Sequence, residues 1–210
     1  MDEREPESAE TENLLRRVRA GDSAAFDELF SRYRAYLRQF AELRLDPKVR
    51  ARVDPSDVVQ DAQLEAVRRL PDYLERPPMP FRLWIRQIAL DRMIKLRRHH
   101  VETARRVVGR EVALPERSSL LLAQQLFTSG SSPSQQFNRR ELAGRVRQAV
   151  TQLSDADREV VLMRNFEGLS NGEVAILLGI DPAEASQRHG RALLRLHTIL
   201  FASGVTESQL

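Results

Sequence analysis

The stretch LSDADREVVLMRNFEGLSNGEVAILLGIDPAEASQRHGRALLRL, residues 153–196, decides the fold. Ser154, Ser170 and Asp181 each precede a helix-periodic segment and have an acidic residue three positions later. This spacing is typical of a capping box, in which the first side chain accepts a backbone N–H and the acid returns the bond. We therefore expect three successive helices, the second ending at Gly179. A short helix, a glycine turn and a longer helix predict a helix-turn-helix.

The rest of the chain also reads as helical. Apolar residues recur at intervals of three and four, and only 9 glycines and 10 prolines interrupt the 210 residues. We predict two helices over 13–45 separated at Gly21-Asp22, a helix from Asp54-Pro55 that Pro71 ends, and a helix starting at Phe81. The prediction is all-α: two small helical domains joined by a flexible linker. Its parts are an acidic disordered tail (1–13), a helical domain (14–101), a linker containing TSGSSPSQQ (102–137), a helix-turn-helix domain (138–202) and a tail (203–210).

Composition excludes several kinds of chemistry. The chain has no cysteine, and its four histidines have no spacing typical of a metal site. It has no glycine-rich phosphate loop and no nucleophile motif, so we expect neither a cofactor nor a bound metal, and no enzyme. No apolar run approaches the roughly 18 residues that a membrane span needs, and the acidic start is not a signal peptide. These features predict a cytoplasmic protein without membrane insertion.

Two basic segments are candidates for nucleic-acid binding. The stretch from Phe81 to Arg110 has nine basic residues against two acidic ones, with aromatic residues among them, which suits phosphates and unpaired bases. The second helix of the helix-turn-helix would present arginines for phosphates or guanine, a glutamine for adenine and a glutamate for cytosine. The alternative is an ordinary helical hairpin with solvated arginines. The candidate residues are Arg82, Arg86, Arg92, Lys95, Arg97, Arg98, Glu184, Ser186, Gln187, Arg188, Arg191 and Arg195.

Four segments, taken in order, resemble the sigma factors of bacterial RNA polymerase in the sigma-70 family, extracytoplasmic function group. They are AFDELFSRYRAYLRQFA (25–41), DPSDVVQDAQLEAVRRL (54–70), PFRLWIRQIALDRMIKLRR (80–98) and residues 153–196. The resemblance implies a factor that directs the polymerase core to specific promoters and stabilises the melted promoter. Spacing alone gives Asp57 only a capping role, whereas the resemblance implies that Asp57, Gln60 and Asp61 bind the polymerase.

The resemblance also implies what the basic segments contact. The helix after Phe81 would meet melted promoter DNA, and the helix-turn-helix would bind a distal duplex element. A sequestering anti-sigma protein is a further expected partner. The alternative function is a free-standing helix-turn-helix transcriptional regulator that binds duplex DNA without polymerase.

Overall fold

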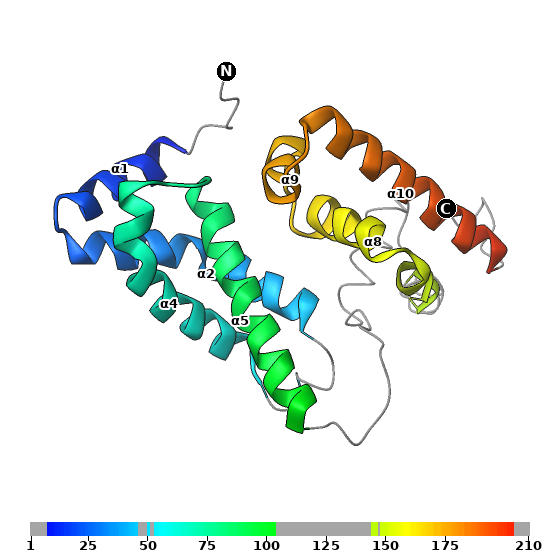
Figure 1. Cartoon of the computed structure of the whole chain (residues 1–210), viewed down its shortest axis with the longest axis horizontal. Helices are drawn as coiled ribbons and strands as arrows, with labels where there is room; N and C mark the ends of the chain where they lie inside the picture. The colour runs from blue at the N-terminus through cyan, green and yellow to red at the C-terminus, as the bar shows by residue number, and fades with distance from the viewer. Residues whose placement is uncertain (1–7, 46–49, 51–52, 104–143, 147, 204–210) are drawn as a thin grey trace, which may run out of the picture. The chain divides into compact units, whose positions relative to one another are not determined.

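The computed structural model describes residues 8–45, 50, 53–103, 144–146 and 148–203 (Figure 1). Every regular element within these ranges is a helix, which confirms the all-α prediction. The chain divides into two compact units, Met1–Gly109 and Arg110–Leu210. Most of the predicted linker, 102–137, lies outside the described residues, as do the tail residues after 203. None of the described helices combines the length and the apolar character required to cross a membrane.

The first unit begins with two antiparallel helices, α1 (Ala9–Arg19) and α2 (Ser23–Arg44). Gly21, at φ +89°, makes the predicted break between them, and Asp22 caps α2 by accepting the N–H of Ala25. The helix α1 starts inside the stretch expected to be a tail. Ser8 caps it, and the acidic side chains in its first turn interact favourably with the helix dipole.

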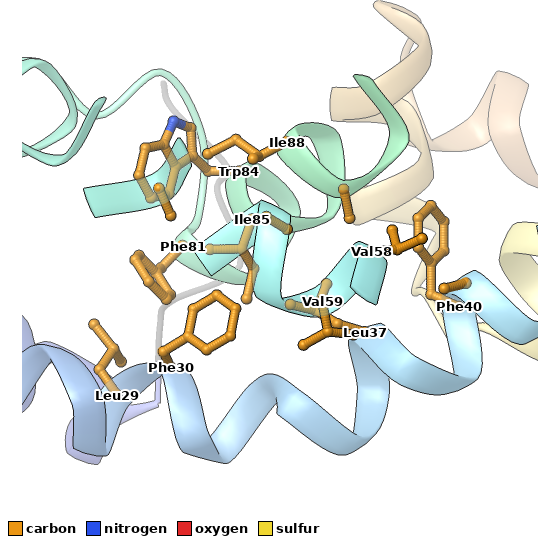
Figure 2. Close-up of a cluster of buried hydrophobic side chains, with 14 of the residues drawn as sticks. Leu29, Phe30, Leu37, Phe40, Val58, Val59, Phe81, Trp84, Ile85 and Ile88 are labelled. Carbon is orange, nitrogen blue, oxygen red and sulfur yellow. The ribbon is translucent and has the colours of Figure 1, made fainter. Parts of the chain in front are cut away.

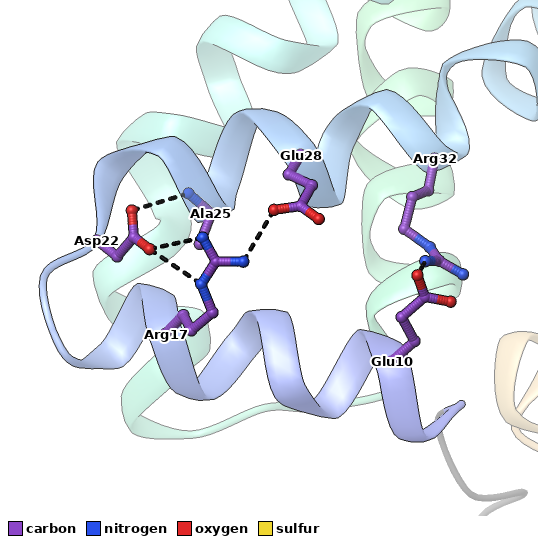
Figure 3. Close-up of polar contacts among 6 residues, drawn as sticks. All are labelled: Glu10, Arg17, Asp22, Ala25, Glu28 and Arg32. Carbon is purple, nitrogen blue, oxygen red and sulfur yellow. Dashed lines mark hydrogen bonds and ion pairs between the residues drawn. The ribbon is translucent and has the colours of Figure 1, made fainter.

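Side chains join α1 firmly to α2 (Figure 3). Arg17 donates to Asp22 at 2.8 Å and to Glu28 at 2.9 Å, and Glu10 pairs with Arg32. Thr11, Leu14 and Leu15 of α1 are also buried, so packing together with these ion pairs keeps the chain helical from Ala9 onward, although the composition of its start is typical of disorder.

The helix α4 (Pro55–Glu75) has the predicted start and a later end. Asp54 and Asp57 form a complete capping box, with proline in the first turn. The prediction that Pro71 ends this helix was wrong, because the chain stays helical to Glu75. The extra turn buries Tyr73, whose ring lies 4.4 Å from that of Trp84, and this packing offsets the hydrogen bond that proline removes.

The helix α5 (Phe81–Thr103) follows the proline-rich loop and packs against α2 and α4 (Figure 2). Tyr73 Oη donates to the carbonyl of Met79, which anchors that loop. The helical spacing of Phe81, Trp84, Ile85 and Ile88 predicts a core position for Trp84, and its 8% exposure confirms this. The three helices contribute the labelled core residues Leu29, Phe30, Leu37, Phe40, Val58, Val59, Phe81, Trp84, Ile85 and Ile88.

The second unit contains helical residues at 144–146 and 148–152, then α8 (Asp155–Val161), the π-helix η1 (Leu162–Phe166), α9 (Asn171–Leu178) and α10 (Pro182–Ala202). All three predicted caps are present, but only Ser170 and Glu173 form the complete box. The carboxylates of Asp157 and Glu184 instead bind arginines.

The turn between α9 and α10 has the geometry of a helix-turn-helix. Gly179 ends α9 in the left-handed conformation, at φ +65°, where glycine has no steric cost. The small side chains of Ala175 and Ala185 are buried, so the two helices approach closely, and Ala192 and Leu196 continue the buried side of α10. The sequence predicts these four residues together with Leu178 and Ile180 as the core of the helix-turn-helix, and those two are only partly buried.

Candidate nucleic-acid interface

The predicted polymerase-binding residues lie on the outer side and flank of α4. Asp57 and Gln60 are exposed, and Asp61 is partly exposed. The carboxylate of Asp57 accepts the N–H of Asp54 at 3.1 Å, so its capping role is present. Asp61 lies toward α5, where Arg92 approaches it to 3.8 Å.

Two apolar residues extend this surface. Leu64 is 59% exposed and Val67 is 50% exposed, at four and seven positions after Gln60. The apolar spacing of residues 54–70 predicts Val67 in the core, but position 67 lies almost opposite the buried Val58 and Ala62 around the helix. A helical-wheel projection of α4 would have placed Val67 on this exposed side. We call Asp57, Gln60, Asp61, Leu64 and Val67 the α4 face.

Ion pairs connect the flank of α4 to α5. Glu65 accepts a hydrogen bond from Arg69 at 2.8 Å, and this bond holds the pKa of Glu65 below its ordinary value. Arg69 also lies 3.6 Å from Asp91 on α5. The interleaving of acidic and basic groups leaves α5 less uniformly basic than its sequence indicates.

The basic residues of α5 do not form one exposed surface. Lys95 is exposed, and Arg82 is partly exposed with its guanidinium 4.7 Å from the ring of Tyr36. Arg86 is only 2% exposed and lies 4.9 Å from the ring of Phe40, which corrects the expectation that it binds DNA. Arg97 and Arg98 belong to α5, but their side chains lie outside the described residues.

On α10, the six candidate residues fall into two groups. Ser186, Gln187, Arg191 and Arg195 are exposed, whereas Glu184 and Arg188 are partly exposed. Three of the six take part in ion pairs: Glu184 with Arg188 on the same helix, and Arg195 with Asp157 at the start of α8. No local pattern of charges could indicate the second pair, because its members are 38 residues apart.

Asp157 and His189 hold α10 against the preceding helices. Burial raises the pKa of Asp157, but hydrogen bonds from Ser154 and Arg195 outweigh it and leave that pKa below its ordinary value. The Nε2 atom of His189 lies 2.8 Å from Asn165 Oδ1 in η1. Burial, with a smaller effect of Arg164, lowers the pKa of His189. Among the described residues, no cluster of His, Asp or Glu could hold a metal ion.

The fold and these surfaces define a class: an all-helical protein with a helix-turn-helix whose second helix presents polar and basic side chains. Residues 143–196 match the family model described as sigma-70, region 4. The chain is 31% identical over 189 residues to the RNA polymerase sigma factor CnrH of Cupriavidus metallidurans, covering 90% of this chain and 93% of that protein. The chain belongs to the sigma-70 family of RNA polymerase sigma factors, in its extracytoplasmic function group.

Other relatives agree with this membership. The ECF sigma factor SigD of Mycobacterium tuberculosis is 26% identical over 185 residues, covering 88% of this chain and 81% of SigD. Two solved structures share the fold. CnrH in complex with the cytosolic domain of CnrY has a TM-score of 0.57 at 24% identity, covering 92% of this chain and 99% of that one. RpoE in complex with the anti-sigma factor NepR, from Bartonella quintana, has a TM-score of 0.51 at 18% identity, covering 83% and 96%.

Proposed function

We propose that this sigma factor recruits core RNA polymerase through the α4 face and selects promoters through α10 and α5. The observation that carries the proposal is the separation of these surfaces: the α4 face belongs to the first unit, and the helix-turn-helix belongs to the second. Two modest binding sites on one chain give high combined affinity when both are engaged. The protein acts by binding, in the cytoplasm where polymerase works, and not by catalysis.

The α4 face supports polymerase binding by its composition. It combines two acidic groups and an amide with the exposed Leu64 and Val67. Exposed apolar side chains with polar neighbours on one helix face are typical of a protein-binding surface. Its occupant is a helical, basic surface of the largest polymerase subunit, which can bury the apolar pair and neutralise the carboxylates.

The two DNA surfaces contact different parts of the promoter. Ser186, Gln187 and Arg191 of α10 contact the distal duplex element, where exposed polar groups can reach base edges. Arg82, Arg92, Lys95, Arg97 and Arg98 of α5 contact the upstream edge of the melted region. Arg86 is left out of this set because it is buried.

We also propose that an anti-sigma protein binds this chain. The solved structures of two relatives, CnrH and RpoE, contain the cytosolic domain of CnrY and the anti-sigma factor NepR, respectively. A partner that covers the α4 face or α10 would block polymerase or promoter binding. Such a partner would be captured by the full chain, and excess core polymerase would compete with it.

Transcription in vitro tests the main proposal. Purified core polymerase is combined with the wild type or with the variant Gln60→Ala/Asp61→Ala on fragmented genomic DNA. Asp57 stays intact because it caps α4. The matched control is Glu12→Ala/Asn13→Ala, which removes the same kinds of group from the exposed side of α1.

The expected result is that the wild type and the control start transcripts at discrete sites, whereas the α4 variant loses core binding by about tenfold or more. If the wild type binds duplex DNA but never associates with core, the protein is a free-standing regulator and the proposal fails. If the α4 variant and the control bind core equally, the α4 face is not the polymerase site.

A further inference from the structure

An acidic side chain occupies the first turn of α10, on the helix that binds DNA in the proposed function. Glu184 is the third residue of this helix, and its N–H is bonded to the capping carboxylate of Asp181 at 2.7 Å. Its own carboxylate does not close the capping box. Glu184 Oε1 instead accepts from Arg188 Nε at 3.0 Å and also from Nη2.

This ion pair reduces the number of Arg188 N–H donors that are available to DNA. Arginine has five N–H donors on a planar group, and the carboxylate engages the edge formed by Nε and Nη2. Both side chains are close to 40% exposed, so the pair is on the surface. Its net charge is zero, and a phosphate that approached Arg188 would meet the negative charge of Glu184 at the same place.

Of the exposed residues near this pair, Ser186 and Gln187 lack charge, and Arg191 carries a positive charge. Ser186 and Gln187 can bond base edges, but they cannot release counterions from the phosphate backbone as a free arginine does. Phosphate contacts strengthen binding to every sequence equally, whereas base contacts distinguish sequences. When a carboxylate holds Arg188, the helix therefore loses affinity for DNA of every sequence. Base contacts then contribute a larger share of the binding free energy.

We propose that Glu184 is a specificity-determining residue that withholds Arg188 from DNA phosphates. With one phosphate-binding arginine fewer, α10 depends more on base contacts, and its preference for a matching distal element is larger. This inference rests on the proposed function, in which α10 binds the promoter.

The test measures binding of the holoenzyme, formed with core polymerase, to two duplexes over a range of salt concentrations. One duplex carries a promoter mapped by transcription in vitro, and the other has its distal element scrambled. The variant Glu184→Ala frees Arg188. The matched control is Asp155→Ala, which removes one exposed carboxylate that pairs with an arginine on the same unit. The double variant Glu184→Ala/Arg188→Ala shows whether Arg188 carries the effect.

For Glu184→Ala we expect affinity for the scrambled duplex to rise by roughly threefold to tenfold, the effect of about one phosphate contact. The ratio of the affinity for the promoter duplex to the affinity for the scrambled duplex falls. The slope of log affinity against log salt concentration becomes steeper by about one. The double variant loses this gain, and Asp155→Ala shows none of it. Circular dichroism confirms that each variant is folded.

Two results would overturn the inference. The gain could persist without Arg188, in which case Glu184 acts only as a general negative charge. The preference and salt slope could also match those of Asp155→Ala, which would leave Glu184 without a role in selectivity. A wild type with no preference for the promoter duplex would instead contradict the proposed function of α10.

Discussion

At the scale of single residues, Asp157 and Arg195 make a contact between the second half of α10 and the start of α8. Asp157 is buried, also accepts from Ser154 Oγ at 2.8 Å, and receives the Arg195 guanidinium across 38 residues of sequence. Arg195 was expected to bind DNA. Its pair with Asp157 indicates that it also positions α10, while its side chain stays 60% exposed.

Replacing Arg195 by glutamine tests this role. We expect the free energy of unfolding of the second unit to fall by about 1 kcal/mol, because a buried carboxylate loses its charged partner. The pKa of Asp157 lies below its ordinary 3.8, so the contribution is present above that pH and is lost as pH falls through the lowered pKa. Thermal unfolding at neutral and acidic pH measures both effects.

The control for Arg195 is Arg191→Gln. Arg191 is exposed and in the proposed DNA surface, so its loss should leave stability nearly unchanged and reduce the salt dependence of DNA binding by about one. Equal effects of the two substitutions on salt dependence would show that Arg195 also contacts phosphate.

His189 gives the second unit a pH dependence near neutrality. Burial and Arg164 lower its pKa, so the folded unit binds a proton less readily than the unfolded chain. Stability is therefore greatest above the ordinary pKa of 6.5 and decreases as pH falls below it toward the lowered pKa. We expect the melting temperature of the second unit to drop between about pH 7.5 and 5.5. In His189→Gln most of this drop should be absent, and a drop of the same size in that variant would assign it to other groups.

At the scale of helices, replacing each of two glycines of the helix-turn-helix by alanine should have opposite effects on stability. Gly179 has φ +65°, which strains any residue with a Cβ, whereas Gly190 lies inside α10 with open space where the Cβ of an alanine would stand. Gly179→Ala should destabilise the unit by about 1 kcal/mol, and Gly190→Ala should stabilise it by up to about 1 kcal/mol. Chemical denaturation of the two variants compares them directly. Stabilisation by Gly179→Ala would mean that the turn has another conformation.

Helix starts were predictable from the sequence because caps are local. Ser170, Asp181 and Asp54 each bond a backbone N–H within three residues, so the neighbouring residues contain the information. The end of α4 was not predictable in this way. The favourable packing of Tyr73 on Trp84 depends on α5, and no local pattern around Pro71 contains it.

In the functional surfaces, too, some features follow from neighbouring residues and others depend on packing between helices. The register of Asp57 and Gln60 on α4 follows from helical periodicity, and both are exposed. The burial of Arg86 over Phe40 depends on how α2 packs against α5, so a count of basic residues could not reveal it. The role of α4 in binding polymerase came from the resemblance to sigma factors, since a polar helix face by itself is usually only solvated.

At the scale of the whole chain, the two compact units predict that the proposed activities can be separated. A chain ended after Gly109 keeps the α4 face and α5. We expect it to bind core polymerase while losing selection of the distal promoter element. Co-purification with core and transcription from promoters with an intact or scrambled distal element measure the two properties. The same shortened chain with Gln60→Ala/Asp61→Ala should no longer bind core, and retained binding would place the polymerase contact elsewhere.

The only tryptophan of the chain, Trp84, is buried against Tyr73 in the first unit. Its emission is therefore an optical signal from one half of the molecule. Fluorescence follows the unfolding of the first unit alone, while circular dichroism at helical wavelengths averages both units. Two melting curves from one unlabelled sample would thus separate the stabilities of the halves, and coincident curves would show that they unfold together.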